Sequence, residues 1–112
     1  MQEERLRALI LDLPEVEEYE HGGLPAFRVR GKRFATMLDA SGINLMPGDE
    51  LIRAWAAQWP DACTERWFAG RRAAVRVAFG ALDDTILREL LTESWLSKAP
   101  ARLRVSSGLD SG

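Results

Sequence analysis

Residues 13–35 constrain the fold of this 112-residue chain more than any other stretch, and they read LPEVEEYEHGGLPAFRVRGKRFA. Pro14 ends the apolar helical stripe that precedes it, because the residue before a proline avoids the helical conformation. Residues 16–21 then read as an acidic strand, and two glycines break it. In residues 27–30, apolar and basic side chains alternate with the period of a half-buried strand. A helix that leads into adjacent strands joined by short turns indicates an antiparallel sheet.

The rest of the chain continues this pattern. Apolar stripes of helical spacing predict helices near residues 2–13, 49–59 and 83–97, with Asp49 and Asp83 as N-caps. We expect a single antiparallel six-stranded sheet with flanking helices, an α+β fold in the order α-β-β-β-β-α-β-β-α. Hairpin loops are expected at Gly31-Lys32, as a type II′ turn, and around Gly70-Arg71. The predicted core comprises Phe27, Val29, Phe34, Leu38, Leu45, Leu51, Trp55, Val75, Val77, Leu87, Leu90 and Leu91.

The composition fits one cytoplasmic domain, residues 1–104, followed by a flexible tail, residues 105–112. A single cysteine, Cys63, rules out an intramolecular disulfide and suits a reducing compartment. No apolar run approaches membrane-spanning length. His21 is the only histidine, so a nucleophile–base pair or a tetrahedral zinc site has no complete set of residues. The sequence therefore predicts a non-enzymatic protein without metal or other cofactor.

The charges are unevenly distributed although the net charge is only −2. Residues 1–22 hold seven acidic and two basic residues, whereas residues 28–33 and 66–76 hold basic residues and no acidic one. Guanidinium groups on hairpins suit the phosphate oxygens of a nucleic acid. The alternative is the ordinary polar face of a sheet, salt-bridged to the acidic N-terminal strand. The candidate phosphate-binding residues are Arg28, Arg30, Lys32, Arg33, Arg71, Arg72 and Arg76.

Four blocks of the sequence resemble the MmcQ/YjbR family over roughly residues 5–103. They are LPEVEE from Leu13, HGGLPAFRV from His21, GKRFA from Gly31, and the closing LL…SW…AP of residues 90–100. The resemblance implies a CyaY-like fold, similar to that of frataxin. It also implies a DNA-binding protein with a two-winged basic surface. The expected partner is duplex DNA, bound with low sequence specificity by a monomer or weak dimer.

Two other functions remain open from the sequence. Trp55 and Trp59 have helical spacing and could line an apolar cleft that binds a protein or a small ligand. The acidic residues of the N-terminal strand could instead bind a cation. Alternation places Glu18 and Glu20 on one face and Glu17 and Tyr19 on the other, so that a solvated edge is the simpler interpretation.

Overall fold

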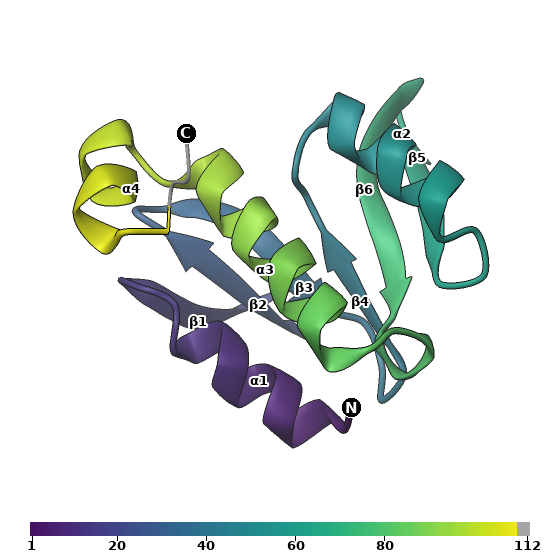
Figure 1. The fold of residues 1–112 in the computed structure, drawn as a ribbon, viewed down its shortest axis with the longest axis horizontal. Coiled ribbons are helices and arrows are strands. Elements are labelled where there is room, and N and C mark those ends of the chain that lie inside the picture. The colour runs from purple at the N-terminus through teal and green to yellow at the C-terminus, as the bar shows by residue number, and fades with distance from the viewer. Residues whose placement is uncertain (110–112) are drawn as a thin grey trace.

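The computed structural model describes residues 1–109, and Figure 1 shows its helices and strands. The chain begins with α1 (Glu3–Leu11), and four strands lead to α2 (Asp49–Gln58). Two more strands, a short 3₁₀ turn, α3 (Asp84–Lys98) and α4 (Ala101–Ser107) follow. The α+β class and the predicted order of helices and strands are confirmed, with α4 as an addition. The strands are β1 (Val16–His21), β2 (Leu24–Val29), β3 (Lys32–Met37), β4 (Gly42–Leu45), β5 (Cys63–Phe68) and β6 (Arg71–Ala78).

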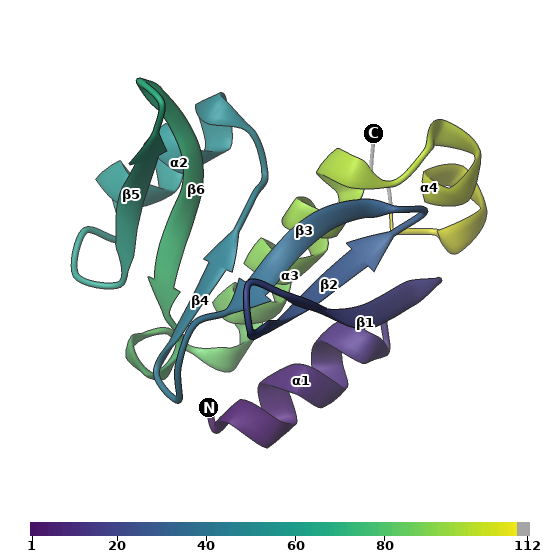
Figure 2. The same ribbon diagram turned by 180° about the vertical axis from the view of Figure 1, so that it is seen from behind.

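The six strands form one antiparallel sheet in the order β1-β2-β3-β4-β6-β5. Helix α3 packs against β3, α2 packs against β5 and β6, and α1 packs against β1. Figure 2 shows the opposite side of the sheet, where the strands lie in front of α2 and α3. The core therefore lies between the sheet and the helices. The acidic strand β1 and the strand β5, which carries Glu65 and Arg66, form the two edges of the sheet.

The core follows the predicted apolar stripes closely. Ten of the twelve expected residues are buried, and the exceptions, Leu38 and Leu51, are half-buried. Ile52 is buried beside Leu51 and takes the inward position on α2. Trp95 is fully buried, and its indole Nε1 donates a hydrogen bond to the Pro14 carbonyl oxygen at 3.0 Å. That bond fixes the end of the α1 segment to α3.

Ser94 joins three parts of the fold. Its hydroxyl donates to the Phe34 carbonyl oxygen at 2.7 Å and accepts from the Met46 backbone N–H at 3.0 Å. Ser94 is fully buried, so these bonds replace the water that its hydroxyl loses on folding. They hold α3 against β3 and against the connection from β4 to α2.

The hairpin loops lie one residue earlier than the sequence predicted. The loops are Arg30-Gly31, with φ of 49° and 80°, and Ala69-Gly70, with φ of 52° and 79°. Positive φ at both central residues is typical of a type I′ turn, so the expected type II′ turn at Gly31-Lys32 is wrong. The type I′ turn matches the twist of the flanking strands. As a consequence, Lys32 and Arg71 are the first residues of β3 and β6.

One register shift changes the direction of an arginine. In the β5–β6 pair, Arg66 lies opposite Ala74 but Trp67 lies opposite Arg72, so Ala73 is an extra residue on β6. An extra residue reverses the alternation of faces along a strand. Arg72 consequently points to the helical side, where it reaches Asp49 of α2.

The helix ends are partly as expected. Asp83 caps α3 through its Oδ1, which accepts from the Thr85 backbone N–H at 2.8 Å. The predicted cap at Asp49 is wrong, because Gly48, with φ of 106°, occupies the N-cap of α2 and Asp49 is the first helical residue. Helix α4 extends to Ser107 and so includes residues 105–107 of the predicted tail, while Leu103 of the same helix is buried in the core. Residues 110–112 of that tail lie outside the described residues.

Candidate functional site

Two of the four cations of the β2–β3 hairpin, Arg28 and Arg30, are neutralised by acidic residues in and just before β1. The Arg28 Nε lies 3.3 Å from Glu17 Oε1, and its guanidinium lies 4.4 Å from the centre of the Tyr19 ring. The Arg30 Nε donates to Glu15 Oε1 at 2.5 Å. The hydrogen bond from Arg30, and secondarily its charge, holds the pKa of Glu15 below its ordinary value. For Arg28 and Arg30, the alternative of a salt-bridged polar face is therefore the observed arrangement.

Arg72 is also paired. Its Nε donates to Glu65 Oε2 at 3.0 Å and its Nη1 donates to Asp49 Oδ1 at 3.3 Å. The hydrogen bond with Glu65 is the largest cause of the raised pKa of Arg72. The guanidinium also lies 4.7 Å from the centre of the Trp67 ring. Arg72 therefore organises the β5–β6 hairpin, and its charge is already balanced.

Arg76 is held by the turn between β3 and β4. Its Nη2 lies 3.5 Å from Asp39 Oδ2 and 3.4 Å from Ser41 Oγ. Hydrogen bonds from the Ser41 backbone and side chain lower the pKa of Asp39, with smaller contributions from Gly42 and Arg76. Asp39 is therefore ionised near neutral pH and neutralises Arg76.

The remaining predicted residues have no acidic partner. Within residues 1–109, no carboxylate oxygen lies within 4.0 Å of the side-chain nitrogens of Lys32, Arg33 or Arg71. The same is true of Arg66 and Lys98, which the sequence analysis did not select, and of Arg53, Arg88, Arg102 and Arg104, which do not line the pocket that Arg66 and Lys98 share. The name unpaired cations is used here only for Lys32, Arg33, Arg66, Arg71 and Lys98.

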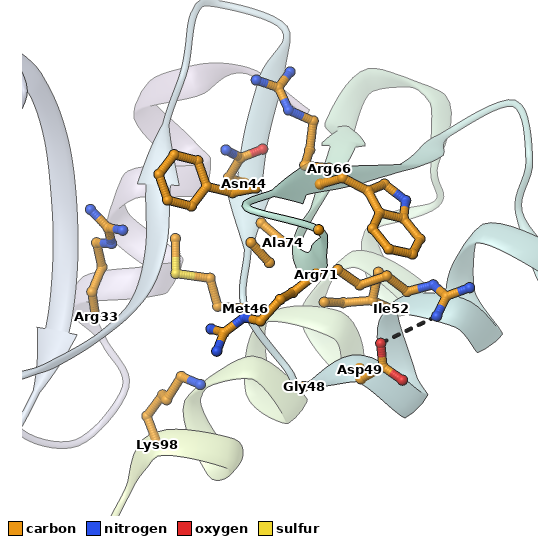
Figure 3. Close-up of a pocket in the computed structure, with 15 residues that line it drawn as sticks. Arg33, Asn44, Met46, Gly48, Asp49, Ile52, Arg66, Arg71, Ala74 and Lys98 are labelled. Carbon is orange, nitrogen blue, oxygen red and sulfur yellow. Dashed lines mark hydrogen bonds and ion pairs between the residues drawn. The ribbon is translucent and has the colours of Figure 1, made fainter.

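Four of the unpaired cations, all except Lys32, line one pocket of about 910 Å³. The pocket arises because β4 ends at Leu45, whereas β3 and β6 extend beyond it on either side. Figure 2 shows β3 and β6 diverging at this end of the sheet. In Figure 3, Arg33 comes from β3, Arg66 from β5, Arg71 from β6 and Lys98 from the end of α3. This pocket is called the basic pocket.

The electrostatics of the basic pocket favour an anion. Lys98 has a lowered pKa because it is partly buried, and secondarily because of the charge of Lys32. Lys98 is also the last residue of α3, where the helix dipole favours a positive charge. An anionic ligand would relieve the repulsion between these lysines. Among the described residues, Asp49 is the one carboxylate that lines the pocket, and it is paired with Arg72.

Two aromatic side chains of β5 add apolar surface to the basic pocket. Trp67 is 55% exposed and Phe68 is 78% exposed, and both line the pocket. The sequence analysis missed them as site residues. One signal was available, because adjacent residues in a strand face opposite sides and two neighbouring aromatic residues cannot both enter one core. The apolar lining continues with Met46, Ile52, Ala73 and Ala74.

One polar atom in this region lacks a partner. The side-chain oxygen of Asn44 is buried and accepts no hydrogen bond from the described residues. Asn44 lies on β4 and lines the basic pocket, as Figure 3 shows. A buried carbonyl oxygen without a donor is uncommon in folded proteins. The described residues therefore leave one buried amide oxygen beside the pocket without a hydrogen bond.

The structure also brings Trp55 and Trp59 together, in a second pocket of about 460 Å³ between α2 and α3. Trp55 is only 5% exposed and belongs mainly to the core, whereas Trp59 is half-buried. Arg88, Glu89 and Glu93 of α3 contribute charged groups to the same pocket. This pocket is smaller than the basic pocket, and its charged groups make it less apolar than the cleft that the sequence predicted.

The acidic side chains in and near β1 do not converge on a common point where they could bind a cation. Glu18 forms an ion pair with Arg7, while Glu17 and Glu15 pair with arginines of the first hairpin. Within the described residues, no three His, Cys, Asp or Glu side chains are close enough to hold a metal ion. The predicted separation of Glu17 from Glu18 is confirmed by their register partners, Arg28 and Phe27.

The two candidate reactive side chains lie apart. His21 is exposed at the end of β1, where its ring meets Tyr19 edge-on with 6.3 Å between ring centres. Cys63 is buried at the start of β5, and burial raises the pKa of its thiol to about 11. A thiol with this pKa is protonated at neutral pH and is a poor nucleophile.

The fold and this pocket define an α+β domain with one helix-covered sheet face and a basic pocket at one end. The chain belongs to the YjbR family, whose model matches residues 11–97. The family resemblance that the sequence indicated is thereby confirmed.

The fold is similar to that of the Deinococcus radiodurans protein DR2400, which has a DUF419 domain, the same family. The two chains share 20% identity with a TM-score of 0.74, and the match covers 97% of this chain and 89% of the other. At this identity, the likeness shows the fold alone. No curated protein matches the sequence.

Within the described residues, no helix is long and apolar enough to cross a membrane. The longest helix, α3, has 15 residues and carries charged side chains on its outer face.

Proposed function

We propose that this chain is a non-enzymatic DNA-binding protein that holds phosphates in the basic pocket. The observation that carries the proposal is the gathering of Arg33, Arg66, Arg71 and Lys98 around one pocket, with no carboxylate partner of their own among residues 1–109. Guanidinium and ammonium groups are the usual donors to phosphate oxygens. Such contacts carry no sequence information, so binding would be tolerant of sequence.

The arrangement of the sheet supports this proposal. The acidic strand β1 is at one edge, and β5, which carries Arg66, is at the other. The carboxylates of Glu15, Glu17 and Glu18 are occupied by arginines that are not in the basic pocket. A chain with a net charge of −2 can therefore present a locally positive surface to a polyanion.

The proposed residues differ from those that the sequence suggested. Arg33 and Arg71 remain, with Lys32 next to the pocket, while Arg66 and Lys98 are added. Arg28, Arg30, Arg72 and Arg76 have a structural role because their charges are already paired. A cytoplasmic location and a monomer or weak dimer complete this proposal.

The second candidate function uses the pocket of Trp55 and Trp59, which would bind a protein segment or a small ligand. Its support is the half-buried Trp59 beside α3. The two candidates are on different parts of the molecule, so one experiment separates them.

The experiment is a titration of the ¹⁵N-labelled protein with a short duplex of mixed sequence at low salt. The proposal predicts backbone amide shifts concentrated in residues 32–34, 66–74 and around Lys98. Amides of Trp55 and Trp59 serve as the internal control and are expected to stay unchanged. Shifts at the tryptophan pocket alone, or no shifts at all, would contradict the proposal.

A further inference from the structure

The exposed aromatic residues beside the unpaired cations indicate a particular form of nucleic acid. We infer that the basic pocket takes single-stranded nucleic acid, with unpaired bases stacked on Phe68 and Trp67. This inference rests on the proposed function and specifies its ligand. Bases in a duplex stack on one another, so a duplex can use only the cations of this site.

The position of Phe68 is the first argument. It is the last residue of β5 and its register partner across the hairpin is Arg71. The ring is 78% exposed and lies beside a cation that has no acidic partner within the described residues. The pair offers a flat apolar surface and a phosphate donor at neighbouring positions. A nucleotide presents the same two features, a base and a phosphate.

The second argument is the rigid placement of Trp67. Its indole Nε1 donates to Glu65 Oε1 at 3.2 Å, and the Arg72 guanidinium lies 4.7 Å from the ring centre. Arg72 is held in turn by Glu65 and Asp49. The cation lies over one face of the indole, and the side chain as a whole is 55% exposed, so a ligand can reach the ring. Since the ring is already fixed, little conformational entropy is lost when a base stacks on it.

The third argument is the charge and shape of the surroundings. Arg66 directly precedes Trp67 in β5, and Arg33 and Lys98 line the opposite side of the pocket. A positively charged groove that carries aromatic side chains is the usual arrangement in proteins that bind single strands without sequence preference. The volume of about 910 Å³ has room for more than one nucleotide unit. A protein partner would gain less from five unpaired cations unless its own surface were strongly acidic.

The test compares three labelled ligands at low salt by fluorescence anisotropy. They are an oligothymidylate of about 12 nucleotides, an abasic oligonucleotide with the same number of phosphates, and a duplex of the same length. We expect the oligothymidylate to bind at least about tenfold more tightly than the abasic strand, because base–aromatic stacking is lost in the latter. The duplex is expected to bind about as weakly as the abasic strand.

Variants assign the difference to the aromatic residues. Phe68→Ala is expected to reduce the preference for the oligothymidylate over the abasic strand, because only the Trp67 ring remains for stacking, and to leave abasic binding unchanged. Phe68→Tyr should retain the preference, because it keeps the ring. Both variants should fold, since the ring is mostly exposed.

The outcomes separate this inference from the proposed function. Equal binding of all three ligands, unaffected by Phe68→Ala, would overturn the inference and leave phosphate binding standing. A preference for the duplex would overturn it as well. No binding of any ligand would overturn both. If folded Phe68→Ala lost affinity for the abasic strand, which has no bases, the ring would be needed for binding in some way other than base stacking. That result would also contradict the inference.

Discussion

The guanidinium of Arg72 lies 4.7 Å from the centre of the Trp67 ring, and the two residues are register partners across the β5–β6 hairpin. Glu65 contacts both, because its carboxylate accepts from the Trp67 indole at 3.2 Å and from Arg72 Nε at 3.0 Å. This cluster keeps a large aromatic side chain in place at a largely exposed hairpin end. It also explains why Arg72 does not act as a free cation.

Replacing Arg72 with Ala should therefore loosen the Trp67 ring without unfolding the domain. The ring loses its cation contact, and Glu65 loses one of its two donors. The heteronuclear NOE of the Trp67 indole N–H should fall. The indole signals of Trp55, Trp59 and Trp95 provide the control and should not change. An unchanged Trp67 NOE would show that Arg72 does not hold the ring.

Replacing Leu90 with Ala should destabilise the core by about 2–5 kcal/mol. Leu90 is buried in the stripe by which α3 faces the sheet, so its loss leaves a cavity. Leu11→Ala is the matched control, because Leu11 is exposed at the end of α1 and should cost well below 1 kcal/mol. Urea denaturation measures both free energies of unfolding. Equal losses in the two variants would mean that α3 does not form the core as described.

Replacing Ser94 with Ala should cost about 1 kcal/mol, less than a core truncation. The variant loses the bond to the Phe34 carbonyl oxygen, but the Met46 N–H still reaches that oxygen at 3.1 Å. Ser97→Ala serves as the comparison, because its hydroxyl bonds to the Met46 and Ser94 carbonyl oxygens nearer the surface. A Ser94→Ala variant as stable as the wild type would show that this junction does not stabilise the fold.

The helical stripes and the order of elements could be predicted from the sequence because they depend on local spacing. Leu87, Leu90, Leu91 and Trp95 repeat with helical period, and all are buried. The site could be predicted only in part. The direction of Arg72 depends on the extra residue Ala73, and no property of the Ala-Ala sequence marks a register shift.

The pairing of charges could not be predicted from local patterns either, because it depends on contacts between segments that are distant in sequence. Arg30 reaches Glu15 because of the β1–β2 register, and Lys98 enters the basic pocket from a helix that is distant in sequence. The basic segments lie on the β2–β3 and β5–β6 hairpins, which contribute Arg33, Arg66 and Arg71 to the basic pocket. The structure was needed to show which of their cations have no partner.

Cys63 gives a pH dependence of stability. Burial raises the pKa of its thiol to about 11, so the folded state favours the protonated form. The stability that comes from burying the protonated thiol is fully present below the pKa of the thiol in the unfolded chain, about 8.5. It is lost as the pH rises through the pKa of the thiol in the folded protein. The wild type should lose more stability than Cys63→Ala between about pH 9 and pH 11. The reference is the difference in the free energy of unfolding between the two proteins at pH 7. If that difference stayed constant up to about pH 11, the thiol would not be buried as described.

His21 and Cys63 should be dispensable for binding. His21→Ala and Cys63→Ser are expected to leave nucleic-acid affinity unchanged, because neither residue lines the basic pocket. Circular dichroism verifies folding of both variants. A folded variant with lost affinity would give that residue a role that this account does not assign.

The salt dependence of duplex binding tests the central claim most directly. The logarithm of the association constant is measured against the logarithm of salt concentration for the wild type, for Arg66→Ala/Arg71→Ala, and for Arg53→Ala/Arg88→Ala. Both double variants remove two positive charges, but Arg53 and Arg88 are exposed on α2 and α3 outside the basic pocket. If both pocket arginines contact phosphates, Arg66→Ala/Arg71→Ala should flatten the slope by about two units, whereas the control should keep the wild-type slope. Equal slopes for all three proteins would contradict phosphate binding in the basic pocket.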